Sequence, residues 1–176
     1  KKSYAQRGIR RKRGEIICNG TSTNIDGRFW EMTTMTLLGD KWMFTATPLD
    51  TSRGVAALYW TGKVNADGTF SPDNITPANI ELPGFARDGD GLLSHTIFQQ
   101  EGKTIALGIV PDKLPSEVNY DMGYAHLYSL PREWSLDANG NLCQKPYAGL
   151  TAMRKGAGVV KKNVTLDGSE KLDGIG

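Results

Sequence analysis

The stretch "GRFWEMTTMTLLGDKWMFTATP", residues 27–48, predicts two β-strands joined by a tight turn. Its residues are mostly aromatic, β-branched or otherwise apolar, and such residues fit a pleated, half-buried surface. Gly39 lies between the two runs, where a hairpin needs a positive φ, and Pro48 marks the exit from the second strand. One acid, Glu31, lies inside the first strand.

Three later stretches have the same layout: "ALYWTGKVNADGTFSP" (57–72), "HTIFQQEGKTIALGIVP" (95–111) and "LYSLPREWSLDANGNLCQKP" (127–146). No segment shows a sustained helical stripe, so we expect an all-β chain of hairpins. The periodicity fits either a loop-rich β-propeller or a β-sandwich. Loops at 78–94 and 111–123 would connect strands at one end of a sheet, where sites commonly form. The expected turn centres and strand exits are Gly68, Gly102, Gly140, Pro72, Pro111 and Pro146.

Glu31 needs an explanation because its neighbours are apolar. Regular alternation would place it on one face with Phe29 and Met35, and Trp30 on the other. A carboxylate in such a place has an ion-pair partner, faces water at an edge, or keeps its proton for a chemical purpose. The pattern alone favours the first two explanations, which are structural.

Charge and composition narrow the function classes. Residues 1–13 hold seven Lys or Arg and no acid, which leaves the other residues of this +2 chain mildly acidic. We interpret residues 1–13 as a basic arm or a truncated strand, with no nucleic-acid partner, because no nucleic-acid recognition motif accompanies them. No apolar run is long enough to cross a bilayer, so we expect no membrane partner. Two cysteines and two histidines do not make a four-ligand zinc motif, so we expect no metal.

Three motifs resemble glycoside hydrolase family 32, which contains invertases, levanases and inulinases. "FWEMTTMTLLGDKWMFTATP" is similar to the segment around the family's Glu-Cys-Pro motif, and "HTIFQQEGKTIALGIVP" to a later strand pair. "GYAHLYSLPREWSLDANGNLCQKP" matches a long family motif. The resemblance covers roughly residues 14–155. It implies that 14–155 form the later blades of a five-bladed β-propeller and that 156–176 form a linker or the start of a C-terminal β-sandwich.

The resemblance also implies a function. The intact protein would be a retaining glycoside hydrolase that cleaves β-fructosidic bonds in sucrose or fructan oligosaccharides without a cofactor. Glu31 matches the family's general acid/base, and its apolar neighbours would keep the carboxyl protonated. Arg132 and Glu133 would be structural charge partners between blades. The substrate-binding candidates are Trp30, Asp88, Asp90, His95 and Tyr124, although from the pattern alone each has a structural explanation.

The departures from the family pattern keep an alternative open. The Cys and Pro of the acid motif are replaced by Met32 and Thr33, and Tyr124 stands where many members have Trp. No segment matches the family's Asn-Asp-Pro nucleophile motif, so we expect the nucleophile in a missing upstream segment and this chain alone to be inactive. Alternatively, the protein is a catalytically silent carbohydrate-binding relative. As a fragment, the chain would expose strand edges and self-associate. The sequence does not indicate a compartment.

Overall fold

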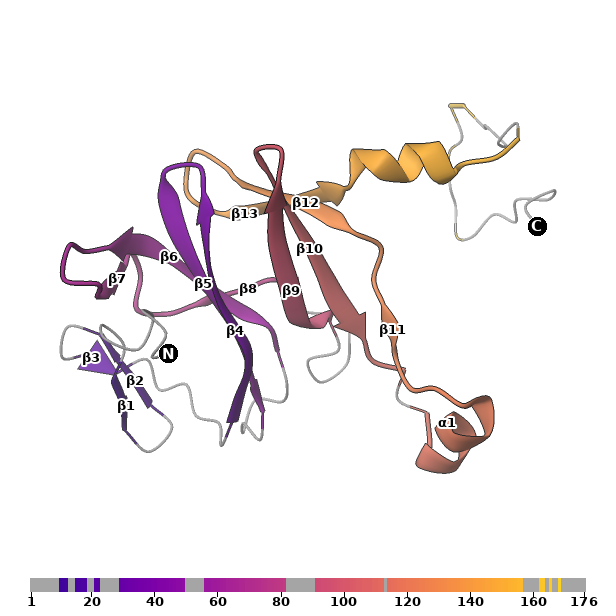
Figure 1. The fold of residues 1–176 in the computed structure, drawn as a ribbon, viewed down its shortest axis with the longest axis horizontal. Helices are drawn as coiled ribbons and strands as arrows, with labels where there is room; N and C mark the ends of the chain where they lie inside the picture. Colours follow the sequence, from indigo (N-terminus) through magenta and orange to yellow (C-terminus); the bar gives the residue numbers. More distant parts are fainter. Residues whose placement is uncertain are drawn as a thin grey trace.

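The structure is a computed structural model that describes residues 10–12, 15–18, 21–22, 29–49, 56–81, 91–112, 114–156, 162–163, 165 and 168. Most of this part of the chain is strand (Figure 1). The strands are β1 (Arg10–Lys12), β2 (Glu15–Cys18), β3 (Thr21–Ser22), β4 (Phe29–Leu38), β5 (Lys41–Leu49), β6 (Leu58–Val64), β7 (Phe70–Pro72), β8 (Ala78–Asn79), β9 (Leu93–Gln100), β10 (Lys103–Val110), β11 (Leu127–Tyr128), β12 (Arg132–Leu136) and β13 (Leu142–Pro146). The helices are α1 (Ser116–Met122) and the 3-10 helix η2 (Ala148–Met153).

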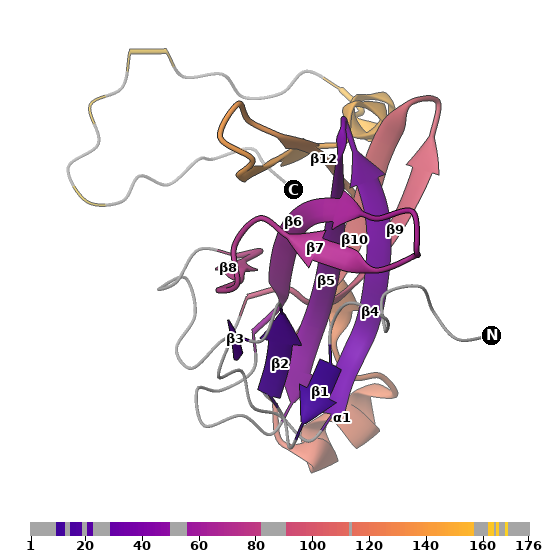
Figure 2. The ribbon, with the colours of Figure 1, turned by 90° about the vertical axis from the view of Figure 1, so that its left-hand side faces the viewer.

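The strands form antiparallel sheets, which confirms the all-β prediction. The first large sheet has the order β4-β5-β6-β7, with β8 also paired to β6. In the second large sheet, β9 pairs with β10, and the order continues through β12 to β13, while β11 pairs with the end of β10. A small sheet holds β1, β2 and β3. The two large sheets lie next to each other, with β4 beside β9 (Figures 1 and 2).

The predicted turns are confirmed. Gly39, Gly68, Gly102 and Gly140 all have positive φ, between 62° and 81°. At the β9–β10 turn Glu101 also has a positive φ, of 50°, which gives the two consecutive left-handed residues of a type I′ hairpin. The predicted strand exits are also confirmed, because each of the four prolines lies within one residue of a strand's end.

The alternation expected for β4 is wrong because the strand contains a bulge. The register with β5 shifts between Glu31 and Thr34, and Met32 has a φ of 47°. An extra residue reverses which face the following side chains occupy. Trp30 and Met35 therefore contact the same apolar cluster, and Glu31 does not share a face with Met35.

The segment 111–123 lies between strands β10 and β11, as predicted, but it is not all loop, since it contains the seven-residue helix α1. Pro115 precedes the helix, and Gly123 ends it with a φ of 78° while its N–H donates to the carbonyls of Asn119 and Tyr120. The helix has no buried residue and lies apart from both large sheets (Figure 1). Because no apolar stripe is buried, hydrophobic periodicity gives no signal for this helix.

Two apolar clusters hold the first large sheet. The cluster between the two large sheets joins residues of both: Leu38, Met43, Ala57, Tyr59, Ile80, Ala106 and Trp134. The cluster on the opposite face of the first sheet contains Phe44, Ala46, Trp60 and Phe70, with Trp30 and Met35 packed against it. The first sheet therefore has buried apolar side chains on both faces, and one of these faces packs against the second sheet.

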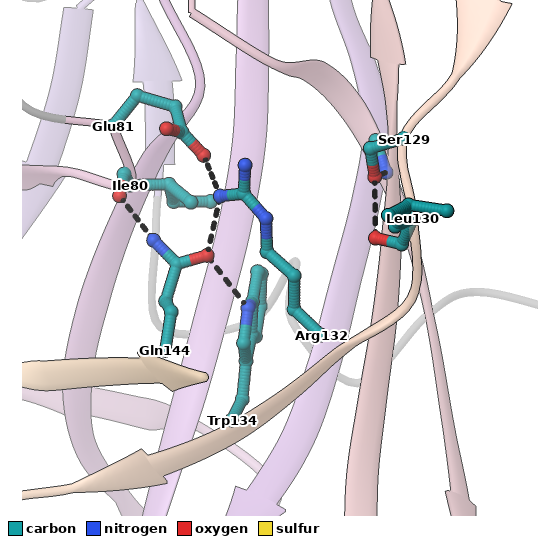
Figure 3. Close-up of polar contacts among 8 residues, drawn as sticks. Ile80, Glu81, Ser129, Leu130, Arg132, Trp134 and Gln144 are labelled. Atoms are coloured by element: carbon teal, nitrogen blue, oxygen red, sulfur yellow. Dashed lines mark hydrogen bonds and ion pairs between the residues drawn. The ribbon is translucent and has the colours of Figure 1, made fainter. Parts of the chain in front are cut away.

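A polar network ties the two large sheets together (Figure 3). The Arg132 guanidinium on β12 donates to Glu81 Oε1 at 2.6 Å and to Gln144 Oε1 at 3.1 Å. Gln144 also accepts from Trp134 Nε1 at 3.0 Å and donates to the Ile80 carbonyl at 2.8 Å. Arg132 is therefore a structural charge that links the two sheets, as predicted.

The prediction that Glu133 is a charge partner between blades is wrong for the contact that the structure describes, which lies within one sheet. Its carboxylate lies 3.5 Å from Lys145 Nζ, its register partner on β13. The pair is thus a cross-strand contact within one sheet. Glu133 does not share the contacts of Arg132, because neighbouring side chains on β12 point to opposite faces.

Candidate functional site

Glu31 lies near the start of β4, where the two large sheets meet. Its Oε2 accepts a hydrogen bond of 2.8 Å from Ser94 Oγ, near the start of β9. The two residues are 63 positions apart in the chain. The partly buried carboxylate thus has a fixed donor on one side. A carboxyl group held in this way can exchange a proton with a substrate oxygen that approaches its open side.

Ser94 is itself held in place. Its backbone N–H donates to Thr47 Oγ1 at 3.0 Å, and both residues are buried. Thr47 is the register partner of Glu31 on β5. Ser94 has a φ of 47°, which is uncommon for a residue other than glycine. The three residues, which we call the Glu31 frame, connect β4, β5 and β9.

The apolar surroundings expected for Glu31 are only partly present. Phe29 and Met32 have exposed fractions of 57% and 47%, so neither encloses the carboxylate. Among the described residues, no Lys or Arg lies within ion-pair distance of Glu31. Its polar partner among the described residues is the Ser94 hydroxyl, and in that part of the chain no cation pairs with the carboxylate.

Trp30 packs away from this carboxylate. Its ring stacks against Trp60, with centroids 5.9 Å apart and planes 14° apart, and against Phe44 at 6.5 Å. Its Nε1 is buried and has no hydrogen-bond partner among the described residues. Stacking of this kind is typical of a core aromatic residue, which is the structural explanation for Trp30.

His95 lies on β9, and its ring packs against Gly108 on β10 and Trp134 on β12. It is 3% exposed, and its ring centroid is 5.2 Å from that of Trp134. Neither ring nitrogen has a hydrogen-bond partner in the part of the chain that the structure describes. Burial lowers the pKa of His95 from 6.5 to about 4, and the positive charge of Arg132 acts in the same direction. His95 is therefore neutral near pH 7.

The remaining substrate-binding candidates lie elsewhere. Tyr124 follows the end of α1 and is 55% exposed. Asp88 and Asp90 lie outside the described residues. The structure therefore brings Glu31 and Ser94 together, with His95 next in the chain, and shows no contact between Glu31 and Trp30 or Tyr124 among the interactions it describes.

The described residues contain no group of three or more His, Cys, Asp or Glu side chains placed to hold a metal ion. Within that same part of the chain, no helix is both long and apolar enough to cross a membrane.

Ser94 and Thr47 are not among the site residues predicted from the sequence. Ser94 and His95 are neighbours on β9 whose side chains point to opposite sides, Ser94 toward Glu31 and His95 toward Trp134. No local sequence signal links Ser94 to an acid 63 positions away, since that contact depends on how the two sheets pack.

Comparison with solved structures finds this fold in glycoside hydrolase family 32. A Bombyx mori GH32 beta-fructofuranosidase matches with a TM-score of 0.58 and 17% identity, over 84% of this chain and 38% of that chain. The sucrose-6-phosphate hydrolase of Lactobacillus gasseri matches with a TM-score of 0.58 and 16% identity, over 84% of this chain and 37% of that one.

A fructan 1-exohydrolase IIa variant from Cichorium intybus, in complex with 1-kestose, matches with a TM-score of 0.54 and 16% identity, over 72% of this chain and 26% of that one. No protein-family model matches the sequence, and no curated protein sequence does. The chain spans less than two fifths of the length of these structures. The resemblance to family 32 seen in the three sequence motifs is thus confirmed in the fold.

Proposed function

We propose that this chain is part of a retaining glycoside hydrolase that cleaves β-fructosidic bonds in sucrose or fructans. The observation that carries the proposal is the Glu31 carboxylate, fixed by Ser94 at the junction of two sheets, in a chain with the fold of family 32. Two of the similar proteins are named as a fructofuranosidase and a fructan exohydrolase. Glu31 would be the general acid/base.

The fold supports a place for the chain in a five-bladed propeller. Each large sheet has four antiparallel strands in succession, and the first strands of the two sheets, β4 and β9, lie beside each other. We propose that these sheets are two of the later blades within residues 14–155, that 1–13 form a basic arm or part of a strand, and that 156–176 lead toward a β-sandwich. Neighbouring first strands of successive blades would line the propeller axis.

The chemistry requires a second carboxylate. A retaining glycosidase uses one carboxylate to attack the anomeric carbon while the other protonates the leaving oxygen. Glu31 would give its proton to the glucosyl oxygen as the bond from C2 of fructose breaks. It would then take a proton from the water that releases fructose from the nucleophile. We propose that the nucleophile lies in an upstream segment, so this chain alone is inactive.

The substrate-binding candidates differ in what supports them. Tyr124 has an exposed ring that can stack on a sugar. Asp88 and Asp90 are proposed as ligands of sugar hydroxyls on the strength of the resemblance alone. Trp30 and His95 already pack against other aromatic rings, so any role in binding would be to shape the wall of the site.

The test uses the intact protein with sucrose, levan and inulin and measures released fructose. We expect release by the wild type and a loss of about 100-fold or more in Glu31→Gln, because a positioned general acid contributes that much. Glu133→Gln is the matched control, since this acid is also partly buried but pairs with Lys145. Both variants should unfold at the wild-type temperature. Full activity in Glu31→Gln would remove this residue from the mechanism.

A catalytically silent carbohydrate-binding protein is the second candidate. Met32 and Thr33 follow Glu31 in place of the Cys and Pro of the family's acid motif, so the immediate surroundings of the acid differ in sequence. Fructan binding without fructose release, in both the wild type and Glu31→Gln, would support this alternative.

A further inference from the structure

Two residues with left-handed backbone conformation adjoin Glu31, one in the chain and one through a hydrogen bond. Met32 follows Glu31 in the chain, and Ser94 donates to its Oε2; each has a φ of 47°. A residue other than glycine adopts this conformation at an energetic cost, and such residues gather where a site needs a fixed geometry. Neither residue is in a hairpin turn, where positive φ has an ordinary explanation.

The conformation of Ser94 has a direct effect on where its hydroxyl points. Its N–H is taken by the buried Thr47 hydroxyl, and its own hydroxyl is directed to Glu31 Oε2 at 2.8 Å. His95, the next residue, points instead toward Trp134. The backbone at Ser94 therefore separates two side chains with different surroundings.

The bulge has the matching effect on β4. It breaks the register between Glu31 and Thr34, so Glu31 points toward β9 while Trp30 and Met35 keep contact with the aromatic cluster on the other face. Without the bulge, Glu31 and Met35 would have shared a face. The bulge in β4 thus orients the Glu31 carboxylate, and the positive φ of Ser94 orients the hydroxyl that donates to it.

We infer that Ser94 is the positioning residue of the proposed acid/base and that it sets which carboxylate oxygen of Glu31 faces the substrate. This inference rests on the proposed function. By holding Oε2, the Ser94 hydroxyl leaves Oε1 to carry the proton to the leaving oxygen. Ser94 itself does not touch the reacting atoms. Thr47 supports it by fixing the backbone from which the hydroxyl projects.

Leaving-group dependence separates positioning from a structural role. The leaving oxygen of sucrose needs a proton. The nitrophenolate group of an aryl β-fructofuranoside is a stable anion and leaves without one. The value of kcat/KM reports only the steps up to this bond cleavage. In the intact protein, we expect Ser94→Ala to lower kcat/KM for sucrose about 10-fold, a part of the general-acid effect. The value for the aryl substrate should stay within about twofold.

Ser94→Gly provides the second variant, because glycine adopts positive φ without strain and so folds even if Ser94→Ala does not. It lacks the hydroxyl and should show the same leaving-group dependence. Ser135→Ala is the matched control, since Ser135 is an exposed serine on β12. Glu31→Gln is measured alongside to test the proposed function itself.

The outcomes are distinct. Selective loss on sucrose in Ser94→Ala and Ser94→Gly, with Ser135→Ala unchanged, supports the inference. Equal loss on both substrates, or no loss on sucrose while Glu31→Gln is inactive, overturns the role of Ser94 and leaves the proposed function standing. Full activity of Glu31→Gln overturns the proposed function and the inference with it.

Discussion

His95 should make the stability of this chain depend on pH between about 6.5 and about 4. The folded chain keeps the buried ring neutral, with a pKa of about 4, whereas the unfolded chain takes up a proton near 6.5. The stabilisation is therefore complete above pH 6.5 and is lost as the pH falls toward 4. The full effect is about 3 kcal/mol, since one pKa unit corresponds to about 1.4 kcal/mol. At pH 5 the loss is about 2 kcal/mol.

The perturbation that isolates this effect is His95→Leu, which replaces the ring with an apolar side chain of similar volume. Because neither ring nitrogen has a described hydrogen-bond partner, the replacement strands no polar group among the described residues. Urea unfolding followed by tryptophan fluorescence, at several values from pH 8 to pH 4.5, gives the free energy of unfolding of both proteins. The wild type should lose about 2 kcal/mol more than the variant between pH 8 and pH 5.

The acidic groups with shifted pKa values titrate at lower pH than His95 does. The pKa values of Asp73, Asp112 and Asp137 are lowered from 3.8, chiefly by hydrogen bonds to each carboxylate, so their stabilisation is lost only below this window. A difference between wild type and His95→Leu that stays constant from pH 8 to pH 4.5 would refute the reasoning, because it would mean that His95 titrates alike in both states.

Two further predictions concern contacts made by residues of the second large sheet. Gly108→Ala should destabilise the chain by about 1–3 kcal/mol, because the added Cβ would lie 2.7 Å from Leu92 Cβ and 3.0 Å from His95 Nε2; thermal unfolding measures this, and an unchanged melting temperature would contradict it. Arg132→Met should cost about 1–3 kcal/mol by leaving the Glu81 carboxylate without its cation, and the double variant with Glu81→Leu should recover part of that loss in urea unfolding. Additive effects of the two changes would show that the pair is not coupled.

Local sequence signals predicted the hairpins well. The turns at Gly39, Gly68, Gly102 and Gly140 depend on the φ freedom of glycine, and the strand exits depend on the fixed φ and missing N–H of proline, so both are local properties of the residue type. The all-β class followed from these signals. The bulge in β4 did not, because a register shift depends on pairing with β5 and not on the composition of the strand.

The site was only half predictable. Glu31 was conspicuous as an acid among apolar residues, and its motif context gave it a role to test. Its donor Ser94 and the supporting Thr47 are ordinary strand residues, brought to Glu31 by the packing of β9 against β4 and β5. The helix α1 was missed for a related reason, since a short helix with no buried face has no hydrophobic period.

The Glu31 frame has members on both large sheets. The carboxylate belongs to one sheet and the hydroxyl that orients it to the other, so a small rotation of one sheet against the other would change this hydrogen bond while the strand pairing within each sheet is kept. Gentle heating should therefore disturb the orientation of the Glu31 carboxylate at temperatures where both sheets are still folded. The geometry of the Glu31–Ser94 hydrogen bond therefore depends on the relative position of the two neighbouring sheets.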